Sequence, residues 1–107
     1  MAGTPDDVTT IVRRFAGVVR EQLPVRSVFL YGSHARDEAD SASDIDVGVV
    51  IRSHDHDRRI DFTTILYRCA REVDCRIEPR CIFQDEYENP RAASILAEII
   101  RQSREVA

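Results

Sequence analysis

Residues 29–50 read FLYGSHARDEADSASDIDVGVV, and the apolar runs at the two ends of this stretch decide the fold. Both runs are short and rich in β-branched or aromatic residues, which is typical of buried strands. The first run ends at Gly32 and Ser33, and a polar loop separates it from the second run. The stretch therefore predicts a strand over 26–31, a tight turn with a short helix beginning at Ser33, and a strand over 44–51.

Hydrophobic periodicity predicts the elements on either side of this stretch. Apolar residues recur at helical spacing over 5–22, over 60–73 and in a last helix that begins at Asn89-Pro90. Alternation with period two over 74–83 predicts a third strand. The order predicts an α/β (α+β) fold in which a small mixed β-sheet is flanked by helices. Because 107 residues is the usual size of one domain, we expect a single domain over 1–107.

The same spacing predicts which side chains face inward. In the second strand, Ile45, Val47, Val49 and Ile51 share one face, and Asp44, Asp46, Gly48 and Val50 share the other. In the helix over 60–73, the inward positions are Ile60, Ile65, Leu66, Cys69, Ala70 and Val73, with Phe62 at the margin. In the last helix they are Ile95, Leu96, Ile99 and Ile100. Pro79 indicates that the third strand is an edge strand or ends there.

Composition restricts the class of protein. The net charge of −4 argues against a surface that holds nucleic acid by bulk electrostatics. Cys69, Cys75 and Cys81 contain no C-x-x-C pair, which favours a reducing cytoplasm over a disulfide framework or a zinc knuckle. The chain has neither a leader-like start nor an apolar run long enough to cross a membrane. We therefore expect a soluble cytoplasmic protein.

Two aspartates, Asp44 and Asp46, lie on one face of the predicted second strand. Two residues along a strand separate their Cα atoms by roughly 6–7 Å. Carboxylates this close repel each other by about 3 kcal/mol at an effective dielectric constant near 20. An arginine, a shared proton or a divalent metal would relieve this repulsion, and hard divalent cations prefer carboxylate oxygens. Taken alone, the pair is more typical of an exposed strand face.

The Gly32-Ser33 turn changes this interpretation. It lies between a strand and a helix start, where unpaired backbone N–H groups and the helix dipole attract anions. Glycine permits close approach to the backbone, and Ser33 adds a hydroxyl donor. The alternative is an ordinary turn with Ser33 as the helix N-cap. Together, the turn and the aspartate pair predict a phosphate site beside a divalent-metal site, which suits nucleotide phosphoryl chemistry.

The stretch also resembles the signature of the minimal nucleotidyltransferase (MNT) domain, a branch of the DNA polymerase beta-like nucleotidyltransferase superfamily. That signature is G-S-x-A-R-G, a variable loop, and S-D-I-D followed by a hydrophobic residue. The matching positions are Gly32, Ser33, Ala35, Arg36, Ser43, Asp44, Ile45 and Asp46. Asp37 stands where the family usually has glycine. The resemblance covers nearly the whole chain and implies the polymerase beta-like nucleotidyltransferase fold.

The resemblance implies an enzyme that transfers a nucleoside monophosphate from an NTP, expected to be ATP, to an acceptor hydroxyl. It implies that two Mg²⁺ ions are held by Asp44, Asp46 and a third acid. The segment RIEPRC at 76–81 resembles the place where family members carry that acid, and it indicates Glu78 with Asp74 as the competing candidate. The expected nucleotide-binding residues are Gly32, Ser33, Arg36 and Ser43.

The alternative is a catalytically weak or inactive binding module, such as the antitoxin partner of a HEPN-type toxin. Larger relatives add a helical domain that helps to hold the acceptor, and 107 residues leave no room for one. We therefore expect a HEPN-like helical partner or a homo-oligomer.

The three histidines are not among the residues expected to bind metal or nucleotide. The SHDHD segment, with His54 and His56, is more typical of a solvated turn than of a metal-ligand cluster. His34, in the variable position of the Gly-Ser motif, is expected to be exposed.

Overall fold

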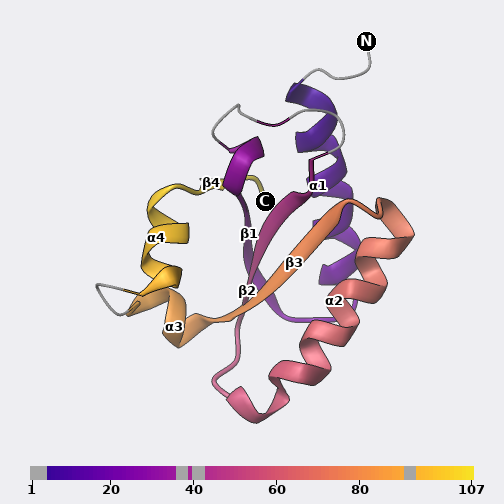
Figure 1. The fold of residues 1–107 in the computed structure, drawn as a ribbon. Helices are drawn as coiled ribbons and strands as arrows, with labels where there is room; N and C mark the ends of the chain where they lie inside the picture. The colour runs from indigo at the N-terminus through magenta and orange to yellow at the C-terminus, as the bar shows by residue number, and fades with distance from the viewer. Residues whose placement is uncertain (1–4, 36–38, 40–42, 91–93) are drawn as a thin grey trace.

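A computed structural model describes residues 5–35, 39, 43–90 and 94–107. The helices and strands follow one another along the chain as shown in Figure 1. In chain order they are α1 (Pro5–Arg20), β1 (Val25–Tyr31), the 3-10 helix η1 (Gly32–His34), β2 (Ile45–Ile51), the 3-10 helix η2 (His56–Arg58), α2 (Arg59–Val73), β3 (Ile77–Phe83), α3 (Gln84–Glu88), α4 (Ile95–Arg101) and β4 (Arg104–Glu105).

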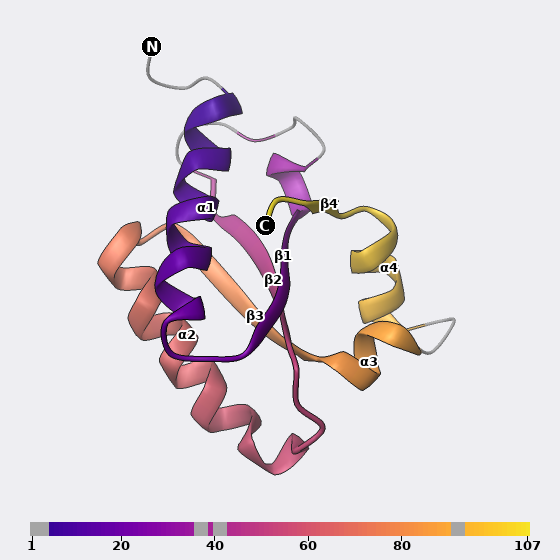
Figure 2. The same cartoon turned by 180° about the vertical axis from the view of Figure 1, so that it is seen from behind.

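The strands form one four-stranded mixed sheet in the order β3-β2-β1-β4. β1 is antiparallel to both β2 and β4, whereas β2 and β3 are parallel and are connected through α2. Helices α1 and α2 cover one face of the sheet, and α3 and α4 lie on the other (Figures 1 and 2). The predicted fold class, a small mixed sheet flanked by helices, is confirmed. Pro79 lies within β3, which is an edge strand as predicted.

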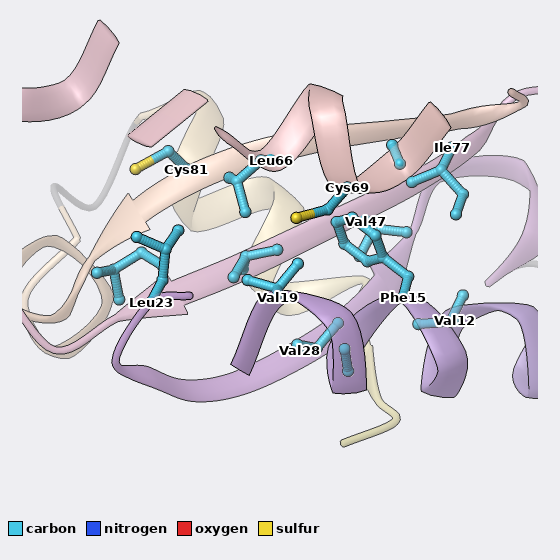
Figure 3. Close-up of a cluster of buried hydrophobic side chains, with 14 of the residues drawn as sticks. Val12, Phe15, Val19, Leu23, Val28, Val47, Leu66, Cys69, Ile77 and Cys81 are labelled. Atoms are coloured by element: carbon cyan, nitrogen blue, oxygen red, sulfur yellow. The ribbon is translucent and has the colours of Figure 1, made fainter. Parts of the chain in front are cut away.

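The main core lies between the sheet and the helices α1 and α2 (Figure 3). The inward face predicted for β2 is confirmed, because its alternate apolar side chains are fully buried: Ile45, Val47, Val49 and Ile51. Phe15 and Leu66 bring the two helices onto this face. Complete burial of one such side chain contributes about 1.5–3 kcal/mol. The alternation of β2 therefore fixes which side of the strand is left for Asp46.

A smaller cluster occupies part of the opposite face. Phe29, Val50 and Ile82 are buried there, and Leu96 and Ile99 of α4 pack against them. Helices α3 and α4 therefore cover only one end of this face, near the end of β3. In the described part of the chain, no helix is both long enough and apolar enough to span a membrane.

The predicted inward face of α2 is wrong at its first positions. Ile60 is 79% exposed, whereas Phe62 is 5% exposed and belongs to the core. The buried stripe of α2 runs through Phe62, Leu66, Cys69 and Ala70. Ile60 is two residues before Phe62 and therefore lies about 200° away around the helix axis. Because Ile60 is also apolar, the sequence pattern near the helix start did not show clearly which face of α2 is buried.

The prediction for the last helix of the chain is also partly wrong. Instead of one helix beginning at Asn89-Pro90, α3 ends at Glu88 and α4 begins at Ile95 after Ser94, whose hydroxyl accepts the N–H of Ala97 at 3.1 Å. Ile95 is 73% exposed rather than inward. The short strand β4 was not predicted, because a two-residue pairing leaves no periodic pattern in the sequence.

Candidate functional site

Three polar side chains form one row across three strands, at the end of the sheet that α3 and α4 leave uncovered. Tyr31 of β1 is the register partner of Asp46 in β2, and Asp46 is in turn the register partner of Glu78 in β3. Register partners in adjacent strands lie about 4.8 Å apart and carry their side chains on the same face. Asp46 is half-buried and Glu78 is exposed. The row lies on the face that α3 and α4 cover only in part.

The turn after β1 approaches this row directly. Gly32 has a φ of 74°, in the left-handed region that side-chain-bearing residues rarely adopt. A β-carbon at Gly32 would collide with Oδ2 of Asp46. The backbone of the turn therefore lies against the Asp46 carboxylate, and only glycine leaves room for both groups.

The turn continues into η1, where Ala35 N–H donates to the carbonyl of Gly32 at 3.1 Å. The predicted short helix is present, but it begins at Gly32 rather than at Ser33. Tyr31 occupies the N-cap position and no side chain caps this helix, so the alternative in which Ser33 is the N-cap is wrong. The half-buried Ser33 is not used as a cap residue.

His34 connects the two halves of the motif. Its Nε2 lies 3.4 Å from the carbonyl oxygen of Ser43. The expectation that His34 is exposed is wrong, because its side chain is half-buried between η1 and the segment before β2. Asp44 follows Ser43, is exposed and lies one residue before β2, which begins at Ile45 rather than at Asp44. Arg36 and Asp37 lie outside the described residues.

The structure separates the two candidates for the third acid. Glu78 lies in β3 beside Asp46, whereas Asp74 lies before β3, which begins at Ile77. Asp74 accepts hydrogen bonds from the backbone N–H of Arg76 at 2.9 Å and from its guanidinium at 3.0 and 3.2 Å. These bonds lower the pKa of Asp74 below its usual value. The strand predicted over 74–83 begins at Ile77, so Asp74 precedes it and only Glu78 lies in the strand.

The acids do not form a preassembled cluster. Among the residues that the structure describes, no group of three or more His, Cys, Asp or Glu side chains is arranged to hold a metal ion. Asp44, Asp46 and Glu78 nevertheless supply only oxygen donors, which Mg²⁺ prefers. Protein sites for Mg²⁺ commonly use one or two carboxylates and complete the coordination with substrate phosphates. The donor chemistry fits a Mg²⁺ site that is completed by a nucleotide.

Tyr31 and Arg80 are site residues that the sequence reasoning missed. Burial raises the pKa of the Tyr31 phenol, and a hydrogen bond with the Arg80 side chain partly opposes that increase. The phenol therefore stays protonated near neutral pH. Each residue has its own signal in the sequence, because Tyr31 directly precedes Gly32 and Arg80 follows Glu78 by two residues on the same strand face. Neither signal indicates that the two side chains meet.

The SHDHD segment lies apart from this row. His54 Nδ1 and His56 Nε2 lie 3.4 and 2.9 Å from the carboxylate of Asp85. Both histidines are exposed, as expected for a solvated turn, and the ring of His56 stacks on Phe83 at 4.6 Å between centroids. These contacts lower the pKa of Asp85, chiefly through the hydrogen bond with His56. The contacts therefore attach the loop after β2 to α3.

Comparison with known proteins agrees with this arrangement. A crystal structure from Sulfolobus solfataricus, of a protein assigned as a nucleotidyltransferase, superposes with a TM-score of 0.71 at 15% identity and covers 94% of this chain and 80% of that one. A toxin-antitoxin structure with AMP-PNP superposes with a TM-score of 0.58 at 16% identity and covers 89% of this chain and 71% of that one. At these identities the similarity establishes the fold.

No curated protein matches the sequence. The model of the nucleotidyltransferase domain family matches residues 12–102, which include β1, the Gly-Ser turn, both aspartates and β3. This chain therefore belongs to the nucleotidyltransferase domain family.

Proposed function

We propose that the chain is a Mg²⁺-dependent nucleotidyltransferase that transfers a nucleoside monophosphate from an NTP, expected to be ATP, to an acceptor hydroxyl in the cytoplasm. The observation that carries this proposal is the position of Asp46. Its carboxylate lies against the backbone of Gly32 on one side, and its register partner Glu78 lies on the other. The turn that we propose binds phosphate and an additional acid thus adjoin the same aspartate.

The proposed binding residues come from both halves of the motif. The backbone at Gly32 and the hydroxyl of Ser33 hold the outer phosphates, and Arg36 and Ser43 contact the nucleotide. Asp44, Asp46 and Glu78 are the oxygen ligands for two Mg²⁺ ions. When bound, the ions neutralise the negative charge of the phosphates. The positive φ of Gly32 supports this assignment, since it brings the turn to the aspartate without a side chain in between.

The proposed reaction needs no covalent enzyme intermediate. The acceptor oxygen forms a bond to the α-phosphorus as the bond to the pyrophosphate oxygen breaks, and in this proposal Glu78 accepts the proton of the acceptor hydroxyl. The remaining residues position the nucleotide and the acceptor for in-line transfer. Positioning and charge neutralisation supply most of the acceleration in such reactions.

The test is transfer of label from [α-³²P]ATP in the presence of Mg²⁺ and a set of hydroxyl-bearing acceptors. We expect Asp46→Asn and Glu78→Gln to lower transfer by about 100-fold or more, while far-UV circular dichroism stays unchanged. Glu72→Gln is the matched control, because Glu72 is an exposed acid on α2 away from the row. Equal transfer by Asp46→Asn and the unchanged protein would contradict the proposal.

A second candidate function is a binding module that acts through a protein partner, such as a HEPN-like helical toxin, or through a second copy of the chain. The similarity to a toxin-antitoxin structure favours it. Affinity purification from the source cell, with and without Asp46→Asn, separates the two functions. Recovery of one stoichiometric helical partner whose activity is blocked equally by both forms supports the binding module, and recovery of none counts against it.

A further inference from the structure

A pocket of about 310 Å³ opens beside the proposed site, at the free edge of β3. Glu78 belongs to its wall, so the pocket and the carboxylate row share one residue. Tyr31 and Arg80 line it from the sheet, and Arg59 and Tyr67 line it from α2. A molecule in this pocket would touch the acid that we propose accepts the proton. The location therefore suits the acceptor rather than the nucleotide.

The two arginines of the pocket differ in their partners. Arg59 is paired with a carboxylate: its guanidinium donates to Glu86 at 2.6 Å and to the carbonyl of Cys81 at 3.0 Å, and it lies over the ring of Phe83. Arg80 is exposed. Within residues 5–35, 39, 43–90 and 94–107 its partner is the phenol of Tyr31, and it forms no ion pair with a carboxylate. The positive charge of Arg80 is therefore available to a ligand.

The hydrogen-bond donors in the pocket wall determine which kind of ligand the pocket favours. A guanidinium presents a planar fork of N–H donors that matches the two oxygens of a carboxylate or a phosphate. The Tyr31 hydroxyl is an additional donor beside it. Because Arg59 is paired with Glu86, Arg80 is the cation of this wall that would repel a cationic ligand. The pocket therefore favours an anionic oxyacid group.

The strand geometry relates this anion to the reacting hydroxyl. Arg80 and Glu78 are two residues apart in β3, so their side chains share a face with Cα atoms roughly 6–7 Å apart. An oxyacid group held by Arg80 would leave a hydroxyl on a neighbouring carbon within reach of the Glu78 carboxylate. Resting on the proposed function, we propose that this pocket is the acceptor subsite and that the acceptor carries a phosphate or carboxylate group close to the hydroxyl that receives the nucleotide.

The test compares glycerol, glycerol 3-phosphate and glycerate, which share hydroxyl groups and differ in the oxyacid. Calorimetric titrations are made with Mg²⁺ and saturating AMP-PNP, so that the phosphate site at Gly32 is already filled. We expect at least one oxyacid probe to bind about ten-fold more tightly than glycerol, and Arg80→Gln to remove that preference. The phosphate and carboxylate probes show which oxyacid is preferred.

Two further variants make the result specific. Arg71→Gln removes an exposed arginine from α2 outside the pocket and should keep the preference. Arg80→Lys keeps the charge but loses the fork, so it should retain only part of the preference. Circular dichroism verifies that each variant is folded. Equal binding of the three probes, or a preference that survives in Arg80→Gln, would overturn the proposal.

The transfer assay distinguishes this inference from the proposed function. In steady-state kinetics Arg80→Gln should raise the KM for the preferred oxyacid acceptor about ten-fold and leave the KM for ATP unchanged. Transfer that is equally efficient to glycerol and to the oxyacids would overturn the acceptor assignment alone. An oxyacid preference in binding without transfer to any acceptor would overturn the assignment together with the proposed function.

Discussion

The backbone of Gly32 and the carboxylate of Asp46 occupy adjoining space that leaves no room for a β-carbon between them. Gly32 follows β1 and Asp46 lies in β2, and the antiparallel register of these strands pairs Asp46 with Tyr31, the residue directly before Gly32. The turn and the aspartate therefore form one unit, although 43–46 is separated from the turn by a long polar loop in the sequence.

The first prediction concerns Gly32→Ala. The new methyl group would displace the Asp46 carboxylate, and alanine at a φ of 74° costs about 1–2 kcal/mol. We expect a matching loss in the free energy of unfolding, measured in urea, and a loss of Mg²⁺-dependent nucleotide binding that exceeds what the lower stability explains. Nucleotide affinity is measured under conditions in which the variant is more than nine-tenths folded.

The control for this prediction is Gly17→Ala. Gly17 lies exposed in α1, and a β-carbon there meets no atom within 4 Å. Alanine is the better helix former, so this variant should be more stable by about 0.5–1 kcal/mol and bind nucleotide as before. Normal nucleotide affinity in Gly32→Ala would show that the site does not depend on the contact between Gly32 and Asp46.

The second prediction separates Asp74 from Glu78 by pH. The pKa of Asp74 is lowered by Arg76, so the pair stabilises the folded state above the unfolded pKa of about 3.9, and this contribution is lost as the pH falls through the folded pKa. We expect Asp74→Asn to lower the free energy of unfolding by about 1 kcal/mol at pH 7 and by progressively less below pH 4. Urea unfolding across this pH range measures the difference.

Transfer activity completes the comparison. Asp74→Asn should keep the activity of the unchanged protein, whereas Glu78→Gln should lose it. If Asp74→Asn lost as much transfer as Glu78→Gln, or destabilised the protein equally at pH 7 and pH 2, the roles that we assign to these two acids would be wrong.

Local patterns predicted the part of the fold that contains the motif. The alternation of β2 gave the buried face correctly, because α1 and α2 cover one face of this strand and bury every second residue. The boundary of β3 was not predictable in the same way. Asp74 and Arg76 continue the alternation but form a local ion pair before the strand. Pairing between strands, rather than periodicity, decides that Glu78 adjoins Asp46.

The rest of the candidate site depends on contacts between distant parts of the chain. Tyr31 and Arg80 are separated by 49 positions, from 31 to 80, and no local pattern indicates that they meet. The pocket similarly combines β1, α2 and β3. The sequence motif identified the candidate metal and phosphate residues, and the neighbouring pocket became visible only when the sheet register was known.

The third prediction concerns the close contact of Gly48 with Phe29. These residues are register partners in β2 and β1, and a β-carbon on Gly48 would collide with the Phe29 ring. Gly48→Ala should therefore lower the free energy of unfolding by about 1–3 kcal/mol through overpacking. Phe29→Leu removes the far end of the ring, so the double variant should be less destabilised than the sum of the single variants.

A double-mutant cycle in urea tests this contact. We expect a coupling energy of about 1 kcal/mol or more between positions 29 and 48. The pair Gly17→Ala and Phe29→Leu is the control, because Gly17 is on the exposed side of α1. The changes in the free energy of unfolding of these two substitutions should be additive. If the changes in the free energy of unfolding for Gly48→Ala and Phe29→Leu were additive, a β-carbon at position 48 would not overlap the Phe29 ring.

The fourth prediction is that one of the three cysteines reacts in the folded protein. Cys75 is exposed, whereas Cys69 and Cys81 are 1% and 5% exposed. Burial raises the pKa of Cys69, and it raises the pKa of Cys81 to about 11, so both thiols stay protonated at pH 8. Iodoacetamide at pH 8 should therefore add one group, located on Cys75 by mass spectrometry, and three groups in denaturant. Cys75→Ser should leave the folded protein nearly unlabelled. Rapid labelling of Cys81 in that variant would show that the wall of the pocket at β3 opens to the reagent, contrary to the packing described.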